Sequence, residues 1–522
     1  MTDQMLATRT EQRSSEGTEG RYRTSAVFGA TFVALMTLLL IRNPGVFTLR
    51  IAERGDAAAN GILVEQAKHF HLLVGNYSRI GFSHPGPAFL YVDALGEWLG
   101  YDVLGVLPSP YSGQWLAAMV LNAALVAAVL TVLWSWSRSW RALLWCAAVV
   151  LVFAGAHDQL LSSTWMPFVY FAPFLLFLTS AASVAAGRTR HAWLLTLSGG
   201  LLVHGHAEFL LLFVPAIALI VVAVLAYRRR RRGAPGPFVP RNWLAAGLVG
   251  GVLAVPMVLN LVLHWPGEYR KYLTYSGAHV SSHGIRADLR YLLGFWCRPS
   301  VVGVSLMVVL FAGVVLLARW QPGAQLRRFL ATGAAIAGAA TALFAVYVVK
   351  GIDQLSLYVG FFFWATPVLL LLLVVTGMEP LIRAAARGTY ARVSAALPAA
   401  ALAGGLVFAG SSGALPARPD RVTGIDRVVR EVAAYGGGRP VVLRLDHDAW
   451  PTMTALLLAG ERAGQRMCID DLKWRFMVTG QFICRERELV AGALVDLAQP
   501  PGADTVTITF GGSVLFLPAG SA

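Results

Sequence analysis

The stretch that decides the fold is residues 113–134, which read GQWLAAMVLNAALVAAVLTVLW and contain no charged residue. Each residue of an α-helix rises about 1.5 Å, and the hydrocarbon core of a bilayer is crossed by about 20 apolar residues. Because a backbone in lipid has to satisfy its own hydrogen bonds, this stretch predicts a membrane-spanning helix.

The same apolar pattern recurs along the chain, and we predict about eleven spans. They lie near residues 25–42, 113–134, 142–157, 164–183, 192–205, 208–227, 243–264, 299–318, 328–349, 357–377 and 393–412. The fifth span is short, and only His206 and Ala207 separate it from the sixth, so these two are candidates for a tight helical hairpin that does not cross fully. The predicted fold class is a mainly α polytopic bundle with a small extracytoplasmic α/β domain at its C-terminal end.

The composition agrees with a membrane protein and argues against a nucleic-acid partner. Of the 522 residues, 56% are hydrophobic and 14% are charged, whereas a soluble domain carries about a quarter charged residues. The net charge is +15, but the basic residues lie between apolar spans and form no continuous basic face. They are better explained as signals of membrane topology.

The distribution of basic residues orients the chain. With the tail 1–24 in the cytoplasm, about 20 Lys and Arg fall on the inner side. The inner connections are 135–141, 186–191, 227–242, 319–328 and 378–392. By the positive-inside rule we predict a multi-pass protein of the plasma membrane. Its transmembrane domain is 25–412, with large outer loops 43–112 and 265–298, and its extracytoplasmic domain is 413–522.

The outer C-terminal domain has the pattern of a small α/β unit. Residues 440–445 predict a strand, 450–463 a helix, and 505–510 with 513–517 a hairpin around two glycines. Cys468 and Cys484 lie in this domain and are candidates for a disulfide. A disulfide here would require an oxidising, extracytoplasmic compartment.

The first outer loop carries the strongest candidate for catalysis. Asp56 follows the first span by about 14 residues, which places it near the membrane interface, where a carboxylate could act as a general base. The alternative is that Asp56 only caps a helix, because the residues after it favour helix formation. Further along, His84-Pro85-Gly86-Pro87 forces a rigid, non-helical turn.

Other polar groups cluster at outer helix ends and are candidates for substrate binding. The full set of candidates is Arg54, His84, Tyr91, His157, Asp158, His204, His206, Glu208, Arg270 and Arg286. Arginines can bind phosphate oxygens with two parallel hydrogen bonds, although pairing with nearby acids or with lipid headgroups explains them as well. His204, His206 and Glu208 suggest metal ligands, but alternate residues diverge by about 200° on a helix, so polar lining of a cavity is preferred. No cofactor is firmly implied, and a divalent metal is not favoured.

These residues resemble the GT-C superfamily of glycosyltransferases, in particular the branch with protein O-mannosyltransferases and the aminoarabinose transferases of lipid A. Members of that branch carry an acidic residue soon after the first span, which Asp56 matches. They then carry a His-Pro-Pro-like turn and aromatic residues, which His84–Pro87, Phe89 and Tyr91 match. This chain departs from the pattern by placing Gly86 between the prolines. It also lacks an Asp-x-Asp in its second outer loop, which favours a monophosphate donor.

The resemblance implies a reaction and its substrates. Asp56 would deprotonate an acceptor hydroxyl, which would attack the sugar of a polyprenyl-phosphate donor. An arginine such as Arg270 or Arg286 would meet the charge of the departing phosphate. The prenyl tail would lie in membrane lipid, and the outer domain would help to bind an acceptor glycan, lipid or protein.

Three other functions remain open from the sequence. A transporter or flippase would place polar groups near the membrane midplane and show related halves, and we find no internal repeat. A glycan polymerase or ligase would keep arginine-rich outer loops without needing the loop of Asp56. A scaffold that binds a partner would tolerate the loss of the Asp56 carboxylate.

Overall fold

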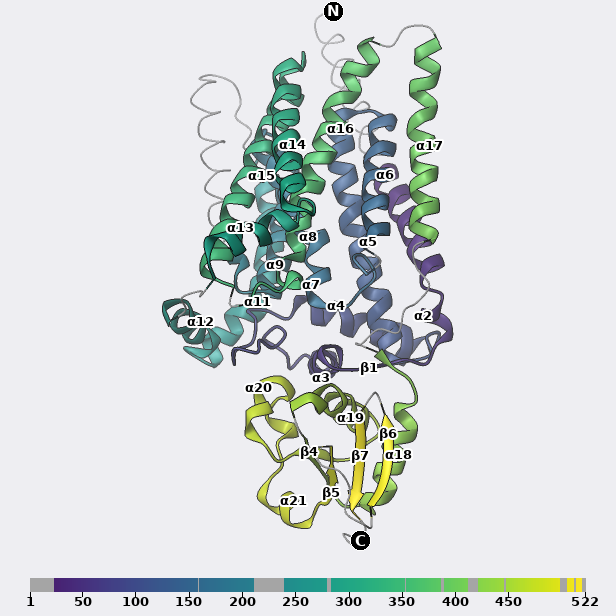
Figure 1. Ribbon diagram of the computed structural model, residues 1–522, viewed down its shortest axis with the longest axis vertical. Coiled ribbons are helices and arrows are strands. Elements are labelled where there is room, and N and C mark those ends of the chain that lie inside the picture. Colours follow the sequence, from purple (N-terminus) through teal and green to yellow (C-terminus); the bar gives the residue numbers. More distant parts are fainter. Residues whose placement is uncertain are drawn as a thin grey trace, which may run out of the picture.

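The computed structural model has two layers, a bundle of long helices and a small mixed domain attached to one end of it (Figure 1). It describes residues 23–157, 159–210, 239–278, 283–352, 354–385, 389–411, 421–445, 447–497, 505–510 and 513–518. Among these residues, seven helices are long and apolar enough to cross a membrane. The predicted class of a polytopic helical bundle is confirmed.

Each predicted span coincides with a helix, apart from 208–227, which lies almost entirely outside the described residues. The helices of the bundle are Arg23–Arg42, α5 (Pro110–Ser137), α6 (Trp140–Ala156), α7 (Met166–Val169), α8 (Phe171–Ala185), α9 (Ala192–Gly205), α11 (Pro240–Leu263), α14 (Ser300–Trp320), α15 (Ala324–Lys350), α16 (Ala365–Ala385) and α17 (Thr389–Ser411). A 3₁₀ segment, η3 (Leu357–Trp364), leads into α16. Helix α6 and the segment Ala396–Ala409 of α17 are apolar but shorter than the seven.

Connections that the sequence assigns to the inner side meet at one end of the bundle. Ser139 donates a hydrogen bond to Glu379 at 2.8 Å. Arg188 donates to Ser135 Oγ at 3.0 Å and to Gln325 at 3.3 Å. Four of the five predicted inner connections therefore lie together, at the opposite end from the small domain (Figure 1).

The two loops that the sequence assigns to the outer side, which keep the name outer loops below, fold into short helices at the other end of the bundle. The first loop forms α2 (Gly45–Thr48), β1 (Ala52–Glu53), α3 (Asp56–Lys68), α4 (Ala88–Glu97) and the π-helix η1 (Trp98–Val103). The later loop forms α12 (Gly267–Ala278) and α13 (Ile285–Gly294). In η1 and just after it, apolar side chains such as Trp98, Val103 and Leu104 are exposed, which suits the boundary of the membrane.

The C-terminal domain is a five-stranded mixed sheet covered by helices, with strand order β4-β3-β5-β7-β6. Its elements are β2 (Arg421–Val422), α18 (Ile425–Gly436), β3 (Val441–Arg444), α19 (Trp450–Arg462), β4 (Met467–Ile469), α20 (Arg475–Val478), α21 (Glu486–Ala491), β5 (Ala493–Asp496), β6 (Thr505–Phe510) and β7 (Ser513–Pro518). Short 3₁₀ turns precede α19, α20 and α21 in this domain, and a further 3₁₀ turn precedes α9 in the bundle. The predicted strand, helix and hairpin are confirmed, and a disulfide joins Cys468 to Cys484.

Helix α3 belongs to both layers. Ala58, Ala59 and Ile62 are part of the apolar core of the C-terminal domain, whereas Leu63 and Val64 are part of the core of the bundle. Apolar residues of a helix are stabilised when they are covered, and α3 lies between α19 and the bundle, which cover its two apolar sets (Figure 1). A division of the chain at residue 412 therefore misses an element that the two domains share.

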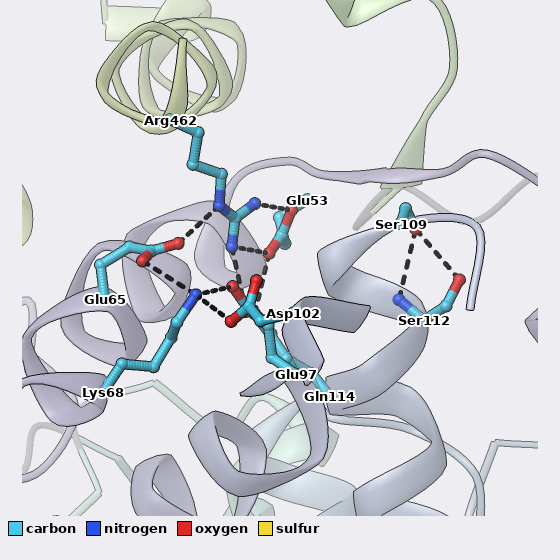
Figure 2. A network of polar contacts seen from close by, with 9 residues as sticks. All are labelled: Glu53, Glu65, Lys68, Glu97, Asp102, Ser109, Ser112, Gln114 and Arg462. Carbon is cyan, nitrogen blue, oxygen red and sulfur yellow. Dashed lines mark hydrogen bonds and ion pairs between the residues drawn. The ribbon is translucent and has the colours of Figure 1, made fainter. Parts of the chain in front are cut away.

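A buried network of charges also holds the two layers together (Figure 2). Arg462 of α19 reaches Glu53, Glu65 and Glu97 at 2.6–3.1 Å. Lys68 contacts Glu97 at 2.9 Å and also pairs with Glu65 and Asp102. The network thus joins the C-terminal domain to four elements of the first outer loop, β1, α3, α4 and η1.

Candidate functional site

A cavity of about 700 Å³ lies where the outer loops meet the bundle. Its walls come from the start of α3, the loop 76–84, the start of α7, the turn after α9, and the segment from Tyr347 to Phe362. Of the predicted site residues, Asp56, His84, His206 and Glu208 line it. These residues come from two outer connections that are more than a hundred positions apart in the chain.

Asp56 is the first residue of α3, and Gly55 occupies the cap position before it. The φ of Gly55 is +61°, a conformation that favours glycine. The side chain of Asp56 accepts hydrogen bonds from the Tyr77 hydroxyl and from Trp165 Nε1, the latter at 3.1 Å. The alternative that Asp56 only caps a helix is wrong, because its oxygens bind side chains in the cavity.

Burial and the negative charge of Asp56 raise the pKa of Tyr77 above its ordinary value. The phenol therefore remains protonated and keeps its role as a donor to Asp56. Arg79 lies 3.9 Å from Asp56, and its side chain is 63% exposed. The site thus pairs a carboxylate that is 32% exposed with a guanidinium that a substrate can reach.

The imidazoles of His84 and His206 face one another with ring centroids 4.1 Å apart. His84 is buried, and burial together with the neighbouring His206 lowers its pKa well below the ordinary value. His84 is therefore neutral at physiological pH. His206 Nδ1 lies 2.9 Å from a carboxylate oxygen of Glu208, so the two form a polar pair on the cavity wall.

His204 lies behind the cavity and supports the His84–Pro87 turn. Its Nε2 faces the carbonyl of Leu253 at 2.7 Å, and its Nδ1 accepts a hydrogen bond from the Ala88 amide at 3.1 Å. These partners require a neutral ring with the proton on Nε2. A Cβ on Gly86 would lie 2.2 Å from the His204 ring, which explains why glycine stands between the two prolines.

The remaining predicted residues that the structure describes do not line the cavity. Tyr91 donates to the carbonyl of Leu72 at 3.0 Å, and His157 packs against Phe153 and Trp364. Arg54 does not line the cavity, and its pKa is lowered by burial. Arg270 and Arg286 are exposed on α12 and α13 and do not line it either, and Asp158 lies outside the described residues.

Several cavity residues were not singled out from the sequence. Asn60 is one helical turn after Asp56, and its side-chain oxygen has no hydrogen-bond partner among the residues that the structure describes. The four-residue spacing on a helix could have indicated it. No local signal distinguishes Trp165, Tyr77 or Arg79, which reach Asp56 only through the tertiary fold.

The described residues include no group of three His, Cys, Asp or Glu side chains arranged to hold a metal ion. The polar groups of the described cavity wall are the carboxylates of Asp56 and Glu208, amides, imidazoles, hydroxyls and the exposed guanidinium of Arg79. Such a set suits a substrate with hydroxyls and a single phosphate.

Comparison of the whole chain with solved structures gives a match to the crystal structure of ArnT from Cupriavidus metallidurans in the apo state. The TM-score is 0.55 with 13% sequence identity, and the match covers 94% of this chain and 98% of that one. The chain has the ArnT fold. No protein-family model and no curated protein matches the sequence.

The match to ArnT covers 94% of the chain and so spans the bundle and the C-terminal domain together. The predicted architecture, a polytopic helical bundle with a small C-terminal α/β domain, is thereby confirmed. At 13% identity the likeness to ArnT concerns the fold, so the chemistry of this chain has to be argued from its own cavity.

Proposed function

We propose that this protein is a membrane glycosyltransferase that moves a sugar from a polyprenyl-phosphate donor to an extracytoplasmic acceptor. The observation that carries the proposal is the position of Asp56, a half-exposed carboxylate in a cavity between the spans and the outer loops. The ArnT fold supports the same class of reaction. The substrate would enter from lipid on the span side and from water on the loop side.

In the proposed reaction, Asp56 takes the proton of an acceptor hydroxyl as its oxygen attacks the anomeric carbon of the sugar. The bond from that carbon to the phosphate oxygen breaks, and its electron pair leaves with the polyprenyl phosphate. Arg79 would meet the charge of this leaving group, because it is the arginine that lines the cavity. Arg270 and Arg286 remain candidates for contacts with the lipid headgroup outside the cavity.

Asn60, His84, His206 and Glu208 are proposed to bind sugar hydroxyls. Asn60 offers an amide oxygen that has no partner in the described part of the chain. The neutral imidazole of His84 can donate or accept without adding charge. The aromatic rings of Trp165 and Tyr358, whose centroids are 5.4 Å apart, form an apolar wall for the face of the sugar ring.

The orientation is proposed with the C-terminal domain outside the cytoplasm. The grouping of the basic inner connections at the opposite end supports this orientation. The disulfide between Cys468 and Cys484 supports it as well, since such bonds persist in oxidising compartments.

The test is the Asp56→Asn variant. Membranes that contain wild-type or variant protein are supplied with radiolabelled polyprenyl-phosphate sugars, and transfer to glycan is measured. We expect the rate to fall by about 10²–10⁴, the range typical of a lost general base. Asp426→Asn is the matched control, because Asp426 is an exposed carboxylate of the C-terminal domain. Equal transfer by Asp56→Asn and wild type, at equal protein levels, would remove Asp56 from the mechanism.

A further inference from the structure

A second cavity, of about 350 Å³, lies next to the first. Tyr77 and Phe82 line both cavities and separate them. The first cavity includes residues of the membrane spans, such as Tyr347 and Phe362, whereas the second is lined by α3, the loop 74–83, α12 and the segment 475–479. The second cavity therefore opens among outer elements and lies on the side away from lipid.

The charged groups of the second cavity leave one cation without a partner. The carboxylate of Glu268 is engaged on both oxygens, by Lys271 at 2.9 Å and by the Ser83 amide at 2.7 Å. Arg475 has no hydrogen bond or ion pair with any residue that the structure describes. One carboxylate thus faces two cations, and the guanidinium of Arg475 is free to bind an anion.

The same cavity carries features of a binding site for a sugar ring. The ring of Phe476 lies 5.8 Å from that of Tyr77 in an edge-on arrangement. Thr479 has φ +67° and ψ 166°, a region that is almost restricted to glycine, and such strain is found at ligand-binding sites. The hydroxyl of Thr479 has no partner in the described part of the chain.

We propose that the second cavity binds the acceptor saccharide through a negatively charged group, a carboxylate or a phosphate. This inference rests on the proposed function. Arg475 and Lys271 would bind the anion, and Phe476 would pack against the apolar face of the sugar. Since Tyr77 lines both cavities and donates to Asp56, an acceptor held here would extend along Tyr77 and present its hydroxyl to Asp56 from the side opposite the lipid donor.

The test measures binding to the purified full-length protein in nanodiscs of neutral phosphatidylcholine. Isothermal titration compares methyl glucuronide, glucose 6-phosphate and the uncharged methyl glucoside. We expect wild-type protein to bind at least one anionic probe about tenfold more tightly than methyl glucoside, as expected for a charge-assisted contact. The probe that is preferred identifies the group as a carboxylate or a phosphate. Equal affinity for all three probes would overturn the proposal.

Variants separate the site from the reaction. Arg475→Gln is expected to abolish the preference for the anionic probe and to leave binding of methyl glucoside unchanged, whereas Arg475→Lys should retain most of the preference. Arg487→Gln is the control, because Arg487 is an exposed arginine elsewhere in the same domain. An unchanged preference in Arg475→Gln contradicts the proposal. Asp56→Asn should bind the probes like wild type, because Asp56 does not line the second cavity. If the wild-type protein binds the anionic probe but transfers no sugar from any donor, the transferase reaction is contradicted and this site is not.

Discussion

At the residue scale, the function of Asp56 depends on what its neighbours do to a single carboxylate. An unsupported aspartate would rotate and hydrogen-bond to water. Here the Tyr77 phenol and the Trp165 indole each bind one of its two oxygens, so the carboxylate is held in one orientation. A base that is held in the right geometry avoids the cost of ordering it during the reaction.

We expect Tyr77→Phe to lower kcat about tenfold, because the variant retains the aromatic ring but loses one donor to Asp56. The KM for the lipid donor should change little, since Tyr77 also faces the second cavity on the side away from lipid. The measurement is steady-state transfer with purified protein. Tyr101→Phe, which removes an exposed hydroxyl, is the control, and an unchanged kcat in Tyr77→Phe would show that this hydrogen bond has no catalytic role.

Asp93 provides a residue-scale prediction on pH. Burial, with the charges of Glu97 and Glu53, raises the pKa of Asp93 well above its ordinary value. Between the pKa of Asp93 in the unfolded chain, near 4, and its raised pKa in the folded chain, Asp93 is protonated when folded and charged when unfolded. The free energy of unfolding therefore falls as pH rises through this range. At high pH, each unit by which the pKa is raised lowers the free energy of unfolding by about 1.4 kcal/mol.

Asp93→Asn should remove this cost, because the amide carries no charge at any pH. We expect the unfolding temperature of the variant to match that of wild type near pH 4.5 and to exceed it at pH 8, measured by intrinsic fluorescence in detergent. Asp426→Asn, at an exposed position, should show no such dependence. Parallel pH profiles for Asp93→Asn and wild type would contradict the raised pKa.

At the scale of elements, the His84–Pro87 turn is built against the end of α9. The amide of Gly86 donates to the carbonyl of His204 at 3.2 Å, and His204 in turn holds the first amide of α4. One histidine therefore sets the path of the turn and the start of the helix that follows. The turn then places His84 in the cavity.

Gly86→Ala tests this packing. The added methyl group would lie 2.2–2.6 Å from the His204 ring, so either the turn or the ring has to move. We expect a destabilisation of about 1–3 kcal/mol, typical of overpacking, together with a loss of transfer activity. Gly284→Ala is the control, since a Cβ there meets nothing within 4 Å. An unfolding temperature equal to that of wild type would show that the turn adapts without cost.

At the scale of the whole molecule, the C-terminal domain is joined to the bundle by buried charges as well as by α3. Burial disfavours the charged form of Arg462, but Glu53 and Glu97 outweigh this effect and raise its pKa above the ordinary value. Gln114 of α5 donates to the same two carboxylates at 2.9 and 2.8 Å. The network therefore runs from α19 through the first outer loop to a membrane span (Figure 2).

Arg462→Met should loosen this junction. The side chains of Glu53 and Glu97 are 1% exposed, and a buried charge that loses its partner costs about 3–5 kcal/mol. We expect a lower unfolding temperature and faster limited proteolysis between the two domains. Arg487→Met is the matched control, and adding Glu53→Gln to Arg462→Met should recover part of the loss. Identical proteolysis of Arg462→Met and wild type would show that the charge network is not needed to hold the domains together.

The sequence by itself determined the class of the protein, the positions of most helices and the small α/β domain. These features are local, because a helix in lipid satisfies its own hydrogen bonds, and its length and composition can be read from one stretch of chain. The resemblance seen around Asp56 and His84 also predicted a fold that agrees with the match to ArnT. In the same way, the two glycines and alternating residues near the C-terminus predicted the hairpin.

Only the tertiary structure decided which candidates share a site. Asp56 meets Trp165, which is 109 positions away in the chain, and Arg79 lies in the cavity where Arg270 and Arg286 do not. The sequence could not distinguish Arg79 from Arg270 and Arg286, because all three have the same residue type and charge. What separates them is the packing of α3 between the bundle and the C-terminal domain, which depends on contacts across the whole chain and leaves no local pattern in the sequence.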